Sequence, residues 1–214
     1  MLEAHAPHEP IHTWKDFFIH IATIVVGLLI AVGLERGVEY FHDRHQLSEA
    51  RAELAQEAED NAGIAAKNRE ALGKLKDQFD ANMRLLLAAQ GSSSPAALNL
   101  PYQWVGALYW PANGAWQVLR QNGALALMPH HELAGYTYFY EGVAAFQEAG
   151  KALAVQIDVA GAIARRSPGG VLGAGDIQEL VAATSECQGR LTYLLKILTL
   201  EEAGLKLLHS APSH

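Results

Sequence analysis

An uninterrupted apolar run near the N-terminus constrains the fold of this chain more than any other sequence feature. Residues 17–34 read FFIHIATIVVGLLIAVGL and contain no Asp, Glu, Lys or Arg. A bilayer core is about 30 Å thick, and a helix that rises about 1.5 Å per residue needs about 20 apolar residues to cross it. With Trp14 before it and Tyr40 and Phe41 after it, the run meets this length and predicts a transmembrane helix.

A removable signal peptide is the alternative interpretation of this run. Ala31 and Gly33 could form a cleavage site, because such sites use small residues. A signal peptide also needs a positively charged start, whereas residues 1–16 carry Lys15 as their only Lys or Arg, together with several acids. We therefore expect a short tail over residues 1–16 and a permanent anchor over residues 17–34.

The charges beside the anchor favour one orientation by a small margin. Cytoplasmic flanks are usually rich in Lys and Arg. The N-terminal flank offers Lys15 and the α-amino group, and the C-terminal flank offers Arg36, Arg44 and Arg51. A difference of about one charge favours a cytoplasmic C-terminal domain.

One face of the predicted anchor is small and faintly polar. Four residues spaced three or four apart share this face: His20, Thr23, Gly27 and Ala31. Helices in lipid associate where small residues let their backbones approach, and an imidazole there prefers a protein or water neighbour to lipid. The pattern indicates either a chance run of common membrane residues or a contact face for another transmembrane helix, in a homo-oligomer or as a subunit of a complex.

The chain from residue 35 to about residue 90 is typical of one long helix continuous with the anchor. It contains no Pro and is rich in Ala, Glu, Leu, Arg and Lys. Apolar residues recur at the spacings of a helix that packs on other helices: Leu47, Ala50, Leu54, Ala58, Leu72, Leu75, Phe79, Met83 and Leu86. The loop signal GSSSP at residues 91–95 ends this helix.

Residues 91–129 form an aromatic-rich segment with almost no charge, in which Arg120 is the only Asp, Glu, Lys or Arg. Pro101 and Pro111 argue against a second membrane span, because such breaks leave backbone groups without partners in lipid; a re-entrant or interfacial segment is the alternative that stays open. We expect an irregular cap with a short helix over residues 114–122, N-capped by Asn113.

Two roles are open for this aromatic-rich segment. Its side chains could plug one end of a helical bundle, or they could form a surface for a partner or ligand, because binding hot spots combine aromatic residues with few charges. The residues concerned are Tyr102, Trp104, Tyr109, Trp110, Trp116 and Arg120.

Two further helices complete the predicted fold. Pro129 suits the first turn of a helix over residues 130–166, whose expected stripe ends in Gln147, Lys151, Val155 and Val159. A last helix over residues 176–209 presents a longer stripe: Leu180, Cys187, Leu191, Leu194, Leu195 and Leu198. The sequence therefore predicts an all-α fold, in which the transmembrane helix continues into a long helix packed with two antiparallel helices as an elongated bundle over residues 35–210.

Composition and motifs point away from nucleic acid and from catalysis. A formal net charge of -7 disfavours a phosphate backbone as partner, and the single cysteine, Cys187, excludes an intramolecular disulfide. The sequence has no phosphate-binding loop, and Ser92–Ser94 have no companion His and Asp in a nucleophile setting. We expect no catalytic residue, no cofactor and no enzyme activity.

Histidines near the anchor are the candidates for metal binding. His42 and His45 share a helix face at a spacing that metal ligands use, and His5, His8 and His12 lie in the tail. No pattern supplies a third ligand for the first pair, and a histidine-bearing tail also binds metals adventitiously. We therefore assign no metal site.

Two parts of the sequence carry a family resemblance. The anchor has the form V-V-G-x-L-x-A before an acidic or amide residue, here Glu35, and Trp116 precedes a G-x-L-x-L-M-P element at residues 123–129. In these features the chain resembles uncharacterised bacterial proteins with a single N-terminal transmembrane helix and a helical domain of unknown function. The resemblance implies a helical domain anchored in the bacterial inner membrane, and it transfers no activity.

Two function hypotheses follow. The first is a non-enzymatic interaction or scaffold protein of a membrane complex, which uses the small-residue face of the anchor and the aromatic-rich segment. The second is a small-molecule or metal sensor that holds its ligand between bundle helices and acts through a partner helix.

Overall fold

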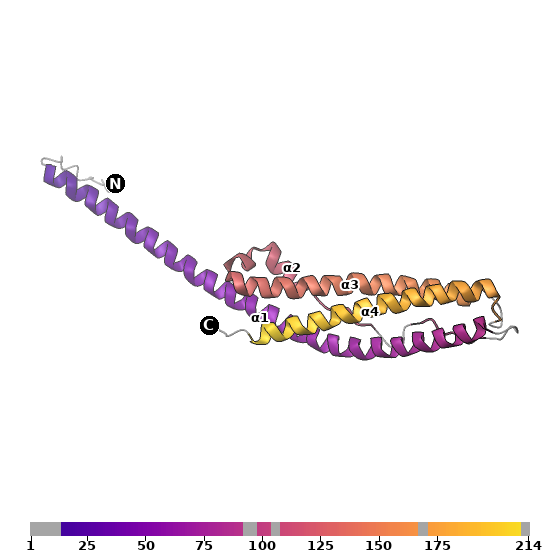
Figure 1. The fold of residues 1–214 in the computed structure, drawn as a ribbon. Coiled ribbons are helices and arrows are strands. Elements are labelled where there is room, and N and C mark those ends of the chain that lie inside the picture. Colours follow the sequence, from indigo (N-terminus) through magenta and orange to yellow (C-terminus); the bar gives the residue numbers. More distant parts are fainter. Residues whose placement is uncertain (1–13, 92–97, 104–107, 167–170, 211–214) are drawn as a thin grey trace, which may run out of the picture. The chain divides into compact units, whose positions relative to one another are not determined.

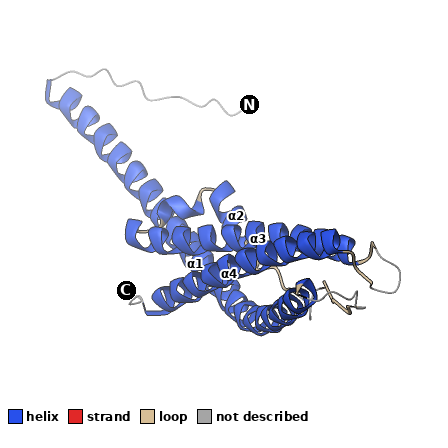
Figure 2. Ribbon diagram, turned by 45° about the vertical axis from the view of Figure 1, so that its right-hand side comes forward, coloured by secondary structure: helices blue, strands red, loops and turns tan. Residues whose placement is uncertain are grey.

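The computed structural model of the 214-residue chain describes residues 14–91, 98–103, 108–166 and 171–210. These ranges form helices joined by loops, and no strand element occurs among them (Figure 2). The elements are α1 (Trp14–Gln90), α2 (Gly114–Gln121), the 3-10 turn η1 (Ala124–Leu127), α3 (His130–Ala164) and α4 (Ala174–Ser210). The predicted all-α fold class is confirmed.

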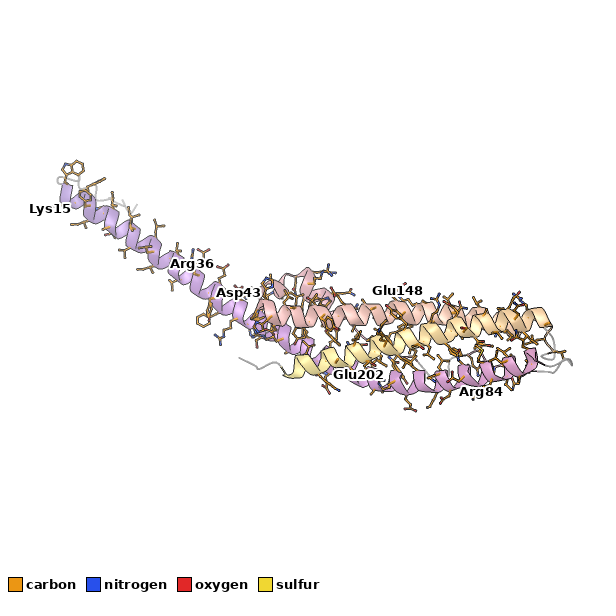
Figure 3. The ribbon with its side chains drawn as sticks, in the orientation of Figure 1. Lys15, Arg36, Asp43, Arg84, Glu148 and Glu202 are labelled. Carbon is orange, nitrogen blue, oxygen red and sulfur yellow. The ribbon has the colours of Figure 1, made fainter. Side chains whose placement is uncertain are left out.

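The chain divides into two compact units, Met1–Glu49 and Ala50–His214. The described part of the first unit is the N-terminal stretch of α1, which contains the apolar run between Lys15 and Arg36 (Figure 3). None of the side chains in this run is buried, and α1 is the one described helix long and apolar enough to cross a membrane.

In the second unit, α1 buries side chains in two rows that each repeat every seven residues. One row is apolar and at most 3% exposed: Ala58, Ala65, Leu72, Phe79 and Leu86. The other row mixes leucine with asparagine: Leu54, Asn61, Asn68, Leu75 and Asn82. Paired rows with this repeat are the pattern of a helix packed along its length against other helices.

The start of α3 lies beside the start of the bundle part of α1, so the two helices run parallel (Figure 1). Arg51 on α1 donates to both carboxylate oxygens of Glu132, in the first turn of α3, at 2.8 and 2.6 Å. Further along both helices, Gln147 of α3 faces the same stretch of chain as Asn61 of α1. The parallel arrangement requires the chain to travel back along the bundle before α3 begins.

The last helix, α4, runs antiparallel to both α1 and α3 (Figure 1). Arg69 of α1 donates to Glu202 near the end of α4 at 2.8 and 2.7 Å, whereas Asp80, further along α1, accepts from Gln188, which comes earlier in α4. The expectation of two helices antiparallel to the long helix is therefore met by α4, whereas α3 runs parallel to α1 and antiparallel to α4.

The buried stripe of α4 agrees with the sequence prediction except at Leu195, which is partly buried, whereas the predicted end of the α3 stripe lies on the wrong face. Leu180, Cys187, Leu191, Leu194 and Leu198 of α4 are at most 1% exposed. On α3, Val155 and Val159 are 64% and 45% exposed, and the buried residues are instead Phe146, Leu153 and Ile157. A spacing of four residues drifts from the helical repeat of about 3.6, so the predicted stripe turned away from the core.

Candidate functional site

Between α1 and α2, the described residues run lengthwise along α1 and in the opposite direction to it. We call these residues the return segment: 98–103 and 108–113. Asn82 of α1 donates to the Pro101 carbonyl at 2.7 Å, and Asn61, further toward the start of α1, donates to the Ala112 carbonyl at 2.8 Å. The interpretation of this aromatic-rich part of the chain as a plug at one end of the bundle is therefore wrong.

Two buried asparagines each form a pair of hydrogen bonds with the backbone of the return segment. Asn61 accepts from the Ala112 N–H at 2.7 Å as well as donating to its carbonyl. Asn68 donates to the Tyr109 carbonyl at 2.7 Å and accepts from its N–H at 2.9 Å. An Asn side chain carries both a donor and an acceptor, so it satisfies an irregular backbone that has no strand or helix partner.

These asparagines hold the return segment in place, and sequence reasoning did not single them out. Asn61, Asn68 and Asn82 are at most 1% exposed. Buried polar groups require hydrogen-bond partners, and the seven-residue spacing of Asn on an otherwise apolar row was the signal that a non-helical stretch of chain packs there. Leu75 occupies the fourth position of the same row.

The N-terminus of α2 is capped by an acid from α1. Glu57 accepts from the backbone N–H groups of Ala115 at 2.9 Å and Trp116 at 3.4 Å, and also from the Tyr140 hydroxyl at 2.7 Å. Asn113, the predicted cap, occupies the cap position but makes no side-chain bond to the helix backbone. Burial and the Glu57 carboxylate raise the pKa of the Tyr140 phenol, so it remains a donor.

Two of the predicted partner-binding aromatics contact other helices of the bundle, Tyr102 as a buried residue and Trp116 as a half-buried one. Tyr102 is 6% exposed and its hydroxyl is hydrogen-bonded to Thr184 of α4. Trp116 stacks on Tyr140 with ring centroids 4.9 Å apart and an interplanar angle of 13°. These contacts fix α2 and the return segment to the other helices.

Two other predicted aromatics, Tyr109 and Trp110, present almost half of their surface to solvent, at 44% and 46% exposure. Lys67 lies over the Tyr109 ring, with its ammonium nitrogen 5.3 Å from the centroid. Arg120 is exposed in the last turn of α2, and Trp104 lies outside the described residues. The predicted surface therefore contains Tyr109, Trp110 and Arg120 as accessible side chains.

The predicted anchor face consists of exposed residues in the first unit: His20, Thr23, Gly27 and Ala31. His20 and Thr23 hydrogen-bond to carbonyls one turn earlier in α1, at 3.2 and 2.9 Å. A side chain added at Gly27 would meet no atom within 4 Å. A larger side chain at Gly27 should therefore leave the helix itself unchanged, and an effect of such a variant would indicate a contact with a partner.

A groove between α3 and α4 forms a cavity of about 380 Å³. Five residues of α3 and five of α4 line it: Tyr138, Phe139, Glu141, Gly142, Ala145, Tyr193, Lys196, Ile197, Leu200 and Glu201. Tyr138, Tyr193 and Leu200 are 54%, 59% and 49% exposed. Cavities of about 300–1,000 Å³ with mostly apolar walls and few polar groups are typical of small-molecule sites.

The polar group that distinguishes this groove is Glu201, which sequence reasoning did not single out. It is 3% exposed, and its Oε2 atom has no hydrogen-bond partner in the part of the chain that the structure describes. Burial, reinforced by the neighbouring Glu202 carboxylate, raises the pKa of Glu201 from 4.5 to about 7. An acid at a core position of an apolar helix stripe was the sequence signal for this site.

Other charged groups lie close to Glu201. Glu202 is held by Arg69 of α1. Lys196 of α4 and Glu141 of α3 line the same groove and are exposed to solvent. The groove therefore presents two carboxylates and one ammonium group, with the buried carboxylate at Glu201.

Metal-ligating residues do not gather in the part of the chain that the structure describes, where no three His, Cys, Asp or Glu could hold one ion. His45 pairs with Glu49 at 3.2 Å, and His5, His8 and His12 lie outside the described residues. Cys187 is fully buried, and burial raises the pKa of its thiol to about 11.

No family model, curated protein or solved structure matches the chain. This result is consistent with the resemblance to an uncharacterised family, and no activity is carried over from a relative.

Proposed function

We propose that this protein is a single-pass membrane protein whose helical bundle serves as an interaction or scaffold module of a membrane complex, without catalysis of its own. The observation that carries the proposal is the apolar run of α1, which has no buried side chain. Leu28 and Leu29, at 60% and 66% exposure, are representative. Lipid would cover this surface, whereas a continuous apolar surface of this size is rare on soluble monomers.

Membrane integration is tested by alkaline extraction of membranes from cells that express the full chain. We expect the protein to stay in the pellet, and the double variant V26R/L29R to be released, because each Arg near the centre of a span costs about 3 kcal/mol. The matched control is V155R, at an exposed position of α3. Release of the unaltered protein would overturn the anchor, as would an intact mass showing that the mature chain begins after Ala31 or Gly33.

The interaction role is tested by purification in mild detergent. A stoichiometric partner, or a defined homo-oligomer, supports it, and a monodisperse monomer without partner from the native membrane contradicts it. The family resemblance suggests the bacterial inner membrane as the location, and the charges beside the anchor favour a bundle on the cytoplasmic side.

A small-molecule sensor is the second candidate function, favoured by the groove between α3 and α4. Its buried, unpartnered carboxylate at Glu201 is costly in a bundle that needs only to pack, because burying a charged or polar group without a partner destabilises a fold. A ligand that compensates this group would stabilise the α3–α4 pair, and the anchor or a partner helix would transmit the change. Thermal unfolding in the presence of ligand series tests this function.

A further inference from the structure

We propose that the groove between α3 and α4 binds a small organic amine, with the ammonium group paired to the carboxylate of Glu201 and the apolar body lying against Tyr138 and Leu200. This inference rests on the second function proposed above, the ligand-responsive bundle, and it specifies the chemical class of the ligand.

The position of Glu201 selects a ligand with a hydrogen-bond donor. Glu201 lines a cavity of about 380 Å³, and among the described residues its Oε2 atom has no hydrogen-bond partner. Because Oε2 is itself buried, the carboxylate must turn toward the cavity to meet a ligand. An ammonium group on a ligand would supply both a donor and the opposite charge, and such charge-assisted bonds are about twice as strong as neutral ones. The cavity is large enough for an amine of modest size.

The walls of the groove select an apolar body and favour a cation. Phe139, Ile197 and Leu200 offer apolar surface, and the rings of Tyr138 and Tyr193 are partly exposed. Aromatic faces attract cations, and the carboxylates of Glu141 and Glu201 outnumber the single ammonium of Lys196. An anionic ligand would meet two carboxylates, with the Lys196 ammonium as the single cation among the lining residues.

The Lys196 ammonium competes with a ligand amine for the position beside the Glu201 carboxylate. It lines the same groove, but the described structure contains no hydrogen bond or ion pair between it and Glu201. A ligand ammonium group would form the ion pair with Glu201 that Lys196 does not form. Replacing Lys196 by Met should therefore tighten amine binding, because it removes a like charge.

The test is calorimetric titration of the full chain in lipid nanodiscs, with empty nanodiscs as the blank, using three probes of similar shape: 2-phenylethylamine, 2-phenylethanol and 3-phenylpropanoate. We expect the amine to bind at least tenfold more tightly than the alcohol or the anion. E201Q should weaken amine binding about ten- to hundredfold, as expected for loss of a charged hydrogen bond, and leave the alcohol unchanged. The matched control is E148Q, on α3 outside the groove (Figure 3).

A second readout, proton release, does not depend on the affinity of a variant. Because the pKa of Glu201 is about 7, the carboxyl is mostly protonated at pH 6.5, and pairing with an ammonium group should release up to about 0.8 proton per ligand. Titrations in buffers of different ionisation enthalpy measure this number. Glu202, Glu141 and Lys196 are the other charged groups near Glu201, and E201Q should abolish the release if Glu201 is its source.

The remaining outcomes distinguish a failure of the amine-binding inference from a failure of the ligand-responsive bundle proposed above. Equal binding of all three probes, unaffected by E201Q, would overturn the amine and leave a ligand-responsive bundle. Binding of none of the probes would overturn the amine and also remove the observation that favours the sensor. Amine binding that persists in E201Q without proton release would place the ligand elsewhere and contradict the inference.

Discussion

The side chain of Asn68 on α1 forms two hydrogen bonds with the backbone of Tyr109, donating to the carbonyl at 2.7 Å and accepting from the N–H at 2.9 Å. Asn61 repeats this arrangement one heptad earlier, with Ala112. The pairs hold the return segment against α1, and they allow α1 and α3 to run parallel, because the chain returns along the bundle before α3 starts.

We expect N68L to lower the free energy of unfolding by about 1–3 kcal/mol, since the change leaves the Tyr109 N–H and carbonyl without their partner. Chemical denaturation of the full chain in detergent, followed by circular dichroism, measures the loss. Q121L, at an exposed position of α2, is the control and should change little. Equal stability of N68L and the unaltered protein would mean that the return segment does not depend on this pair.

Glu57 should be required for the ordering of α2. E57A removes the acceptor for the Ala115 and Trp116 amides and for the Tyr140 hydroxyl, and loss of a helix cap costs about 0.5–2 kcal/mol. Hydrogen exchange at the two amides should accelerate. E53A, one turn earlier on an exposed position of α1, should leave this exchange unchanged.

Gly150 of α3 lies in close contact with the return segment. A Cβ atom there would lie 2.9 Å from Cζ3 of Trp110, so G150A should displace the indole and increase its exposure to water. We expect a red shift of tryptophan fluorescence and a net loss of stability, despite a gain of about 1 kcal/mol in helix propensity. G142A is the matched control on the same helix, because a Cβ at Gly142 meets nothing within 4 Å, and it should be stabilising.

Glu201 should make the stability of the bundle fall as the pH rises between about 4.5 and 7. The folded state keeps the Glu201 proton up to its pKa of about 7, whereas the unfolded chain releases it near 4.5, so the folded state binds more protons within this window. The free energy of unfolding should decrease by up to about 3 kcal/mol across the window and become flat above it.

The variant E201Q isolates this pH effect. It should flatten the slope and be more stable than the unaltered protein at pH 8, because its amide stays neutral. E141Q, at an exposed position of α3, should keep the slope. Stability that rises with pH between 5 and 7 in the unaltered protein, or a slope that survives in E201Q, would assign the titration to another group.

The anchor face should control association within the membrane. G27L/A31L adds bulk to the face shared with His20 and Thr23, and should reduce the oligomer mass measured by light scattering in detergent, because small residues are what let membrane helices approach. A22L/V25L adds bulk to the opposite face and is the control. An unchanged mass in G27L/A31L would exclude this face from the contact.

The predictability of the bundle differs from helix to helix for physical reasons. The stripe of α4 follows the period of about 3.6 residues through Leu180, Leu191 and Leu198, so burial could be predicted from spacing. On α3 the abundance of small residues left the phase ambiguous, and Val155 was assigned to the wrong face. Helix breaks were more certain, as at Gly123, whose positive φ of 82° is accessible to glycine.

The candidate site was less predictable than the fold, because its groups lie far apart in the chain. Glu57 reaches across to α2 and Tyr140, and Glu201 faces a groove completed by Tyr138 and Gly142 of α3. A single sequence gives no pairing information for such contacts. The available sequence signal for Asn68 or Glu201 was a polar residue at a position where the helical repeat predicts an apolar one.

The sequence by itself determined the apolar run of α1, the all-α class and the ends of the long helices, because hydrophobic length, periodicity and breaker residues act locally along the chain. The tertiary structure decided the course of the return segment, the parallel pairing of α1 with α3 and the groove at Glu201. These features depend on which buried donors and acceptors meet across the bundle, as Asn68 meets Tyr109, and that matching exists only once the helices are packed.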